Sequence, residues 1–152
     1  MVGYRIDNVK GLFFDSKKVM RSADRATRRV LSRFGAYVRR SAKSSIRKRK
    51  RVSAPGQPPS SHTGLLKKFI FFAYDPDEKN VVIGPVRLSR KPGQAPEALE
   101  HGGQTTISRR RWRRGRRVTV TQKTRIAARP FMGPAFEREK PKLPAMWADS
   151  IN

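Results

Sequence analysis

Residues 16–46, SKKVMRSADRATRRVLSRFGAYVRRSAKSSI, decide the fold of this chain. Apolar side chains recur in this stretch at steps of mostly three and four residues, which places them along one side of an α-helix, with arginine and lysine on the other side. Asp15 and Ser16 supply oxygen atoms suited to capping the first turn. The apolar stripe consists of Val19, Ala23, Ala26, Val30, Phe34, Tyr37, Val38, Ala42 and Ile46. The stretch therefore predicts one long amphipathic helix.

The predicted helix is longer than a small domain needs. A helix over this stretch would measure roughly 45 Å, which exceeds the diameter of such a domain. Residues 47–51, RKRKR, follow directly and either continue the helix end or begin a loop; we assign 15–51 to the helix. Because the helix is longer than such a domain, we expect part of it to contact something other than its own fold. The apolar stripe has to be buried against a sheet or a neighbouring copy of the chain.

The net charge is the most unusual property of the chain. Its 36 Lys and Arg against 11 Asp and Glu give a formal net charge of +25. Charge of this size repels itself and predicts an anionic neighbour, which is nucleic acid, an acidic protein surface or anionic lipid. Nucleic acid is the first expectation among these. The alternative for any single run of cations is a solvated surface.

The length and the remaining composition narrow the class of protein. The 152 residues fit one domain with a real core. The chain has no cysteine, which excludes disulfides, thiolate metal sites and cysteine nucleophiles. We find no apolar run that could span a bilayer and no signal peptide, so we expect a soluble protein made in a cytoplasm and no membrane partner.

The predicted fold class is α+β, with one long N-terminal helix packed on a mostly antiparallel β-sheet and a short C-terminal helix. The order of apolar runs and of breakers such as proline and glycine carries this prediction. Along the single domain 1–152 we assign 1–14 to a lead-in, 15–51 to the long helix, 52–64 to a flexible loop, 65–127 to β-hairpins and 128–152 to a turn and helix.

Two segments of this plan have specific expectations. The first hairpin pairs 65–74, apolar on both faces in 69–72, with the β-branched residues 81–83. The closing helix starts at about Pro134, and Pro141 and Pro144 are expected to break it early.

Residues 109–117, RRRWRRGRR, are the strongest signal for binding. Alternating residues on either side predict a half-exposed hairpin with this stretch at its tip. Arginine forks bind phosphate or carboxylate bidentately, and Trp112 can stack on a base or on an arginine plane. We predict contacts to DNA or to an acidic partner from Arg109, Arg110, Arg111, Trp112, Arg113, Arg114, Arg116 and Arg117, and from Arg47, Lys48, Arg49, Lys50 and Arg51.

Catalytic patterns are missing from the sequence. It has no nucleotide-binding, zinc-protease or serine-hydrolase signature. Glu97 and His101 would share a helix face, but two ligands do not make a metal site. The acidic residues 75–78 fit a hairpin turn better than a catalytic pair. We therefore predict that the chain is not an enzyme and uses no metal, cofactor or small-molecule substrate.

Three segments together resemble a known family. Residues 53–59, SAPGQPP, followed by 62–70, HTGLLKKFI, are similar to the "APG.PP…TG.L..SI" stretch of small tailed-phage neck proteins, the tail-completion family related to the lambda minor tail protein Z. Residues 96–103, PEALEHGG, and 128–137, ARPFMGPAFE, look like two further segments of that family, in the same order and spacing. His101 stands where the family commonly has an aromatic residue, and the arginine hairpin is more basic than the family leads us to expect.

The resemblance implies a structural virion protein at the head–tail joint. Proteins of this kind form a ring, often of six subunits, that completes the tail or joins it to the head connector, with the genomic DNA passing through the lumen. The implied partners are copies of the chain, the head-connector and tail-tube or terminator proteins, and DNA. Residues carried over as an assembly loop and interface are Pro55, Gly56, Pro58, Pro59, Thr63, Gly64, Leu65, Glu100, Gly102, Arg129, Pro130, Phe131 and Pro134.

The alternative reading is a cytoplasmic nucleic-acid-binding protein of ribosomal or chromatin type, whose basic loops lie between phosphates. The two readings differ in assembly. A neck subunit is expected to form rings or to add to tail or connector particles, whereas a ribosomal-type protein stays monomeric and binds free nucleic acid with a steep salt dependence.

Overall fold

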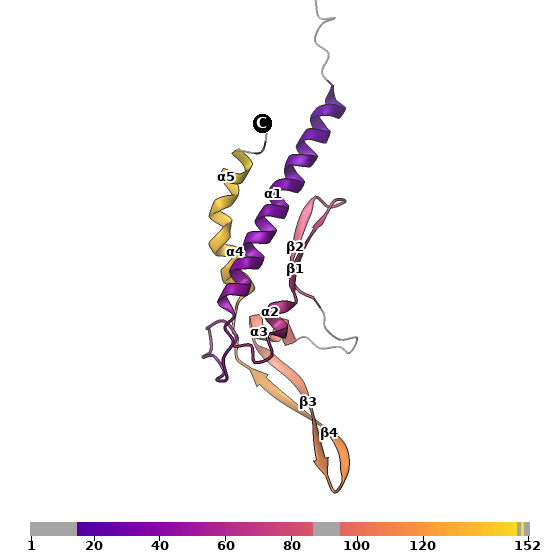
Figure 1. Cartoon of the computed structure of the whole chain (residues 1–152), viewed down its shortest axis with the longest axis vertical. Helices are drawn as coiled ribbons and strands as arrows, with labels where there is room; N and C mark the ends of the chain where they lie inside the picture. Colours follow the sequence, from indigo (N-terminus) through magenta and orange to yellow (C-terminus); the bar gives the residue numbers. More distant parts are fainter. Residues whose placement is uncertain (1–14, 87–94, 149, 151–152) are drawn as a thin grey trace, which may run out of the picture.

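The computed structural model describes residues 15–86, 95–148 and 150, and its fold is α+β as predicted. The predicted lead-in 1–14 lies outside the described residues. One long helix, α1 (Ser16–Ser45), forms the spine of an elongated molecule (Figure 1). A β-hairpin lies along one side of α1 and the C-terminal helices lie along the other, while a second β-hairpin extends away from the body.

Helix α1 begins as predicted and ends earlier than predicted. The Asp15 side chain accepts a 3.0 Å hydrogen bond from the backbone N–H of Lys18 and caps the first turn. The helix ends at Ser45, because Ile46 takes an extended conformation with ψ 112°. The assignment of 47–51 to the helix is therefore wrong, and these cations begin a loop. The Ser44 and Ser45 hydroxyls donate to nearby carbonyls, which is typical of a chain leaving a helix.

The core lies along the C-terminal two-thirds of α1. Buried residues of the predicted stripe meet Ile70 from the first hairpin and Phe131 from the C-terminal region, both of which are almost fully buried. The central cluster consists of Phe34, Val38, Ala42, Ile46, Ile70, Phe131 and Ala135. By contrast, Val19 is 51% exposed and Ala23 is also exposed, so the stripe is uncovered over the first turns of α1.

The first hairpin consists of β1 (Ile70–Asp75) and β2 (Asn80–Pro85), which pair antiparallel with Phe72 opposite Ile83. It confirms the predicted hairpin but starts later. One residue before β1, the chain forms a helical turn, α2 (Leu65–Lys68), entered through Gly64 at a φ of 78°. The prediction of a strand from residue 65 is therefore wrong, because a glycine in the left-handed region starts a turn.

A close approach of backbone and side chains joins this hairpin to α1. A Cβ atom on Gly35 would lie 2.8 Å from Cδ2 of Phe72 and 2.9 Å from a methyl group of Val81. Gly35 is buried in the middle of the helix, where glycine normally lowers stability. The absence of a side chain here lets the sheet lie directly against the helix.

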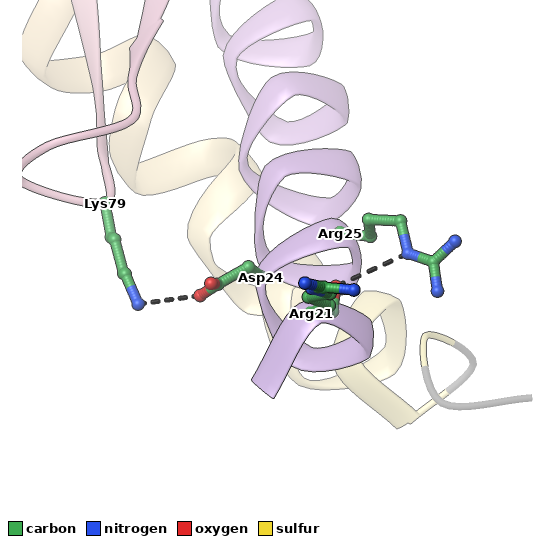
Figure 2. A network of polar contacts seen from close by, with 4 residues as sticks. All are labelled: Arg21, Asp24, Arg25 and Lys79. Atoms are coloured by element: carbon green, nitrogen blue, oxygen red, sulfur yellow. Dashed lines mark hydrogen bonds and ion pairs between the residues drawn. The ribbon is translucent and has the colours of Figure 1, made fainter. Parts of the chain in front are cut away.

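An ion pair fixes the turn of this hairpin to the first half of α1. The Lys79 Nζ lies 2.7 Å from Asp24 Oδ1, and Figure 2 shows the two side chains meeting between the turn and the helix. The hydrogen bond from Lys79 to Asp24, and then the charge of Asp24, raise the pKa of Lys79. On the same helix, Arg25 Nε donates to the carbonyl of Arg21.

The second hairpin is separate from the first. After α3 (Ala95–His101), strands β3 (Gly103–Arg113) and β4 (Arg116–Ile126) pair antiparallel over their full lengths. The described strands thus form two two-stranded sheets, and α1 packs on the β1–β2 sheet. Figure 1 shows β3 and β4 extending beyond the end of α1 as a narrow arm, which we call the arm from here on.

The C-terminal region runs back along α1. Helix α4 (Met132–Glu139) is followed by a 3-10 turn, η2 (Lys140–Lys142), and by α5 (Leu143–Ala148). Phe136 of α4 meets Phe34 edge to face at a ring separation of 5.6 Å. As predicted, the closing helix is broken early, because α4 ends two residues before Pro141, and the chain then continues through η2 into α5. Proline is tolerated here because it stands in the 3-10 turn and in the first turn of α5.

Candidate nucleic-acid interface

The arm ends in a tight two-residue turn. Arg113 pairs with Arg116, and the residues between them, Arg114 and Gly115, have φ values of 50° and 71°. Two successive positive φ values are typical of the turn that best matches the twist of a two-stranded hairpin. The prediction of a hairpin here is confirmed. However, the tip is only Arg114 and Gly115, and the rest of the arginine stretch lies within the strands.

Because most of the arginines are in strands, they are divided between two faces. Residues directly opposite each other in an antiparallel pair share a face. One face therefore carries Arg109 opposite Val120 and Arg111 opposite Val118. The other face carries Arg110 opposite Thr119, and Trp112 opposite Arg117. The arm is therefore cationic on both faces. The sequence pattern did not predict this distribution of the arginines.

Trp112 already has a cationic neighbour on its own face of the arm. The guanidinium carbon of Arg117 lies 5.4 Å from the centroid of the Trp112 ring, a cation–π distance. The ring is nevertheless 69% exposed, so one of its faces is open to a ligand. Of the two partners predicted for Trp112, the arginine plane is therefore present within the chain, and stacking on a base stays a prediction.

The face with Arg109 and Arg111 also exposes apolar side chains. Val118 is 39% exposed and Val120 is 46% exposed, and they lie opposite those two arginines. A shallow hollow of about 80 Å³ opens here, lined by Ile107, Arg109, Arg111, Val120, Gln122 and Thr124. Exposed β-branched residues beside arginine are a pattern typical of a surface that meets a partner.

The basic run 47–51 lies at the same end of the molecule as the arm (Figure 1). Its first residue is tied to the following loop, because the carbonyl of Arg47 accepts a 3.1 Å hydrogen bond from the backbone N–H of Ser61. Arg47 and Arg49 line an open pocket of about 710 Å³, and Arg138 from α4 lines it from another element. The sequence did not predict a role for Arg138, because nothing in a single arginine so far along the chain from Arg47 and Arg49 indicates that it lies beside them.

The predicted assembly loop 52–64 is hydrogen-bonded to the C-terminal region. The backbone N–H of Gly56 donates to the carbonyl of Ala128 at 2.8 Å, and Arg129 Nε donates to the carbonyl of Ser53 at 2.9 Å. Pro59 is buried, and Pro55 and Gly56 are exposed. The loop thus has a defined course, and its predicted ordering on docking stays a prediction.

Several residues predicted at an assembly interface make contacts inside the fold. Glu100 accepts hydrogen bonds from the backbone N–H groups of Phe131, Met132 and Gly133, at the start of α4. Phe131 is 1% exposed in the core. Gly102, at a φ of 75°, lies against the backbone of Ala128.

The remaining members of that predicted set divide between turns and surface. The backbone N–H of Gly64 donates to Ser61 Oγ at 2.9 Å, and Thr63 Oγ1 accepts a 3.4 Å hydrogen bond from the backbone N–H of Leu65. Leu65 is 48% exposed, and Pro134 is exposed in the first turn of α4. Pro58 and Pro130 are partly buried. Thr63, Leu65 and Pro134 are thus the exposed members of this group, which a partner can reach.

A further cationic cluster surrounds an exposed aromatic ring on β1. Arg39 and Lys43 of α1 lie 5.6 Å and 5.7 Å from the centroid of the Phe71 ring, which is 45% exposed. Partial burial, followed by the charges of Arg39 and Lys67, lowers the pKa of Lys43. The exposed Phe71 ring on β1 is thus covered in part by long cationic side chains.

The described part of the chain offers neither a metal site nor a membrane-spanning helix. Across residues 15–86, 95–148 and 150, no three His, Asp or Glu side chains come together in a way that could hold a metal ion. None of the helices in this part is long and apolar enough to cross a membrane.

Comparison of the chain with protein-family models, with curated proteins and with solved structures finds no match.

Proposed function

We propose that this chain is a structural, non-enzymatic subunit of a tailed-phage neck, where copies form a ring, a hexamer in the simplest case, that joins the tail to the head connector around the DNA. The observation that carries the proposal is the arm. Its strands contain arginine and lysine and no acidic residue. A protruding ribbon with cations on both faces attracts an anionic partner, and the genome in a neck channel would supply one.

The three segments that resemble the tail-completion family support this proposal, because they meet in space. Arg129 of the third segment bonds to Ser53 of the first, and its backbone N–H donates to the carbonyl of Leu99 in the second. Glu100 then caps the helix that begins in the third. Short motifs far apart in sequence that form one junction are more specific together than each motif alone.

The uncovered start of α1 supports the assembly of copies. Val19 is 51% exposed and Met20 is 62% exposed, and Figure 1 shows this end of α1 extending past the β1–β2 hairpin. A head-to-tail ring would place the same surface of each subunit on a different surface of the next, and the contact closes by rotation. We propose that Val19 and Met20 are buried in that contact.

The first experiment measures assembly of the purified full chain by mass photometry and negative-stain electron microscopy. We expect rings, and we expect the double variant Val19→Ser and Met20→Ser to shift the population towards monomers. The matched control is Val82→Ser with Val86→Ser, which removes two exposed valines that are 64% and 51% exposed elsewhere. A chain that stays monomeric at every concentration, with or without DNA, would contradict the ring.

The second experiment places the protein in the particle. Antibodies against the chain should label the head–tail joint of virions in electron micrographs. Labelling of ribosomes or of host nucleoid instead would favour the alternative, a cytoplasmic nucleic-acid-binding protein. That alternative is supported by Trp112, because an exposed aromatic ring among arginines is suited to stacking on bases without any ring of subunits.

A further inference from the structure

The pocket beside the end of α1 is distinct from the arm. It has a volume of about 710 Å³ and is enclosed by the end of α1, the loop after it and α4. Its lining residues are Ser44, Ser45, Arg47, Arg49, Ser53, Ala54, Gln57, Pro58, Pro59, Ser60 and Arg138. The lining brings together arginines from two separate parts of the chain, and no acidic residue of the described part of the chain lines the pocket. This composition is typical of an anion site.

None of these three arginines is in an ion pair with the described carboxylates. The two acidic neighbours of Arg138 are engaged by lysines instead: Glu137 pairs with Lys140, and Glu139 pairs with Lys142. Three positive charges around one pocket repel each other, so that an anion between them lowers the free energy of the folded chain. The charge is present before the ligand arrives.

A buried hydroxyl in the pocket wall has no partner. Ser53 Oγ is buried and makes no hydrogen bond in the described structure, and buried hydroxyls normally make at least one. The hydroxyls of Ser44 and Ser45, by contrast, already donate hydrogen bonds to the carbonyls of Ser41 and Ala42. Ser53 is held in place, because its own carbonyl accepts the hydrogen bond from Arg129. Ser53 Oγ is buried behind the pocket surface, so the three arginines, and not this hydroxyl, carry the anion site.

From these observations we infer that the pocket binds a phosphodiester group of a nucleic-acid backbone. Guanidinium forks match the oxygen atoms of phosphate bidentately. The pocket volume is in the range of sites for nucleotide-sized groups. Its lining has no aromatic ring on which a base could stack, so it binds the backbone without regard to sequence.

Two features define how the site holds its ligand. The partial negative charge at the C-terminus of α1 opposes an anion, but it is smaller than the three full charges of Arg47, Arg49 and Arg138. Pro58 and Pro59 make one wall stiff, and the tie between Arg129 and Ser53 fixes the loop. The part of this inference that names DNA as the source of the phosphate rests on the proposed function. The part that assigns phosphate binding to the pocket does not.

The test uses the full chain with Arg138→Gln, because Arg138 lies outside the basic run and is exposed. The matched control is Arg28→Gln, an exposed arginine on α1 that does not line the pocket. Binding of a fluorescent DNA duplex is measured by anisotropy over a series of salt concentrations. We expect Arg138→Gln to weaken binding several-fold and to lower the salt slope by about 0.9, as loss of one phosphate contact should. The control should match the parent.

Three further measurements make the outcome decisive. Inorganic phosphate should shift the NMR signals of the Arg138 side chain, and the duplex should shift the same signals. If phosphate does so and the duplex does not, the site binds free phosphate and the nucleic-acid assignment is overturned. If poly-glutamate shifts them more strongly than the duplex, the ligand is an acidic protein. If Arg138→Gln binds the duplex as the parent does, the pocket is not a phosphate site. If Arg138→Gln still forms rings, failure of the pocket proposal is distinguished from failure of the neck proposal.

Discussion

Glu100 Oε1 accepts a 2.7 Å hydrogen bond from the backbone N–H of Gly133, across 33 positions of sequence. Its other carboxylate oxygen accepts from the N–H groups of Phe131 and Met132 at 2.9 Å and 3.1 Å. One side chain of α3 thus satisfies three of the free donors at the start of α4, where the helix dipole also favours a negative charge. The base of the arm is fixed to the helical body through this contact.

Replacing Glu100 should therefore destabilise the whole fold. We expect Glu100→Ala to lower the free energy of unfolding by about 1–3 kcal/mol, since three charge-assisted hydrogen bonds, two of them partly buried, are lost. Urea denaturation followed by circular dichroism measures the change. Glu97→Gln is the control, because Glu97 is exposed on the same short helix. An equal loss in both variants would show that the capping contact has no special weight.

Gly35→Ala should destabilise the chain although alanine is the better helix former. The new Cβ would lie 2.8 Å from the Phe72 ring, and crowding of this kind costs about 1–3 kcal/mol. The gain in helix propensity is about 1 kcal/mol. We expect a lower melting temperature by differential scanning calorimetry. Gly84→Ala is the control, because no heavy atom lies within 4 Å of its Cβ position. A more stable Gly35→Ala variant would mean that the hairpin does not pack on α1 here.

The Lys79–Asp24 pair predicts a pH dependence at the alkaline end. The pKa of Lys79 is raised above its ordinary value of 10.5 in the folded chain, so the pair stabilises the fold below that pH and its contribution is lost as the pH rises through the raised pKa. We expect the parent to melt above Asp24→Asn near neutral pH and the difference to shrink above pH 10.5. The effect is small, because both side chains are exposed. A difference that grows with pH would contradict the ion pair.

Removing five positive charges from the arm should weaken DNA binding and leave folding intact. We propose to replace Arg109, Arg110, Arg111, Arg113 and Arg114 by Gln. These side chains are exposed, so unfolding free energy should change by less than about 1 kcal/mol. The salt slope of DNA binding should fall by about 0.9 for each arginine that contacts a phosphate.

A variant with the same charge change serves as the control for the arm. Lys17, Lys18, Arg21, Arg25 and Arg28 of α1 are also exposed, and replacing them by Gln removes five charges far from the arm. Equal weakening in both variants would mean that net charge, rather than the arm, governs binding. Infectivity of phage carrying the arm variant then tests its role in the particle.

The sequence was sufficient for the local elements whose signals are local. The stripe from Ala26 to Ile46 repeats with the period of a helix, and its members are buried as predicted except Tyr37, which is half-buried. The arginine hairpin was also found, because its flanking residues alternate with the period of a strand. The sequence predicted the ends of these elements less well. Residues 47–51 were assigned to the helix although the chain leaves it at Ser45, since the buried position of Ile46 depends on Ile70 and Phe131 from elsewhere.

The residues predicted at an assembly interface also show what the sequence could and could not determine. Glu100, Gly102, Arg129 and Phe131 were recognised as important by resemblance, and the structure gives each a contact within the chain. Their type and spacing do not tell a partner surface from an internal junction. That distinction depends on which segments, distant in sequence, lie next to them.

By itself, the sequence determined the long helix, its buried stripe, the two hairpins and the excess of positive charge, because periodicity, turn residues and composition act over a few neighbouring positions. Only the tertiary structure decided that the arginines of the arm lie on two faces and that Arg138 joins Arg47 and Arg49 around one pocket. Strand register and the packing of α4 against α1 set these positions, and both follow from contacts between residues far apart in the chain.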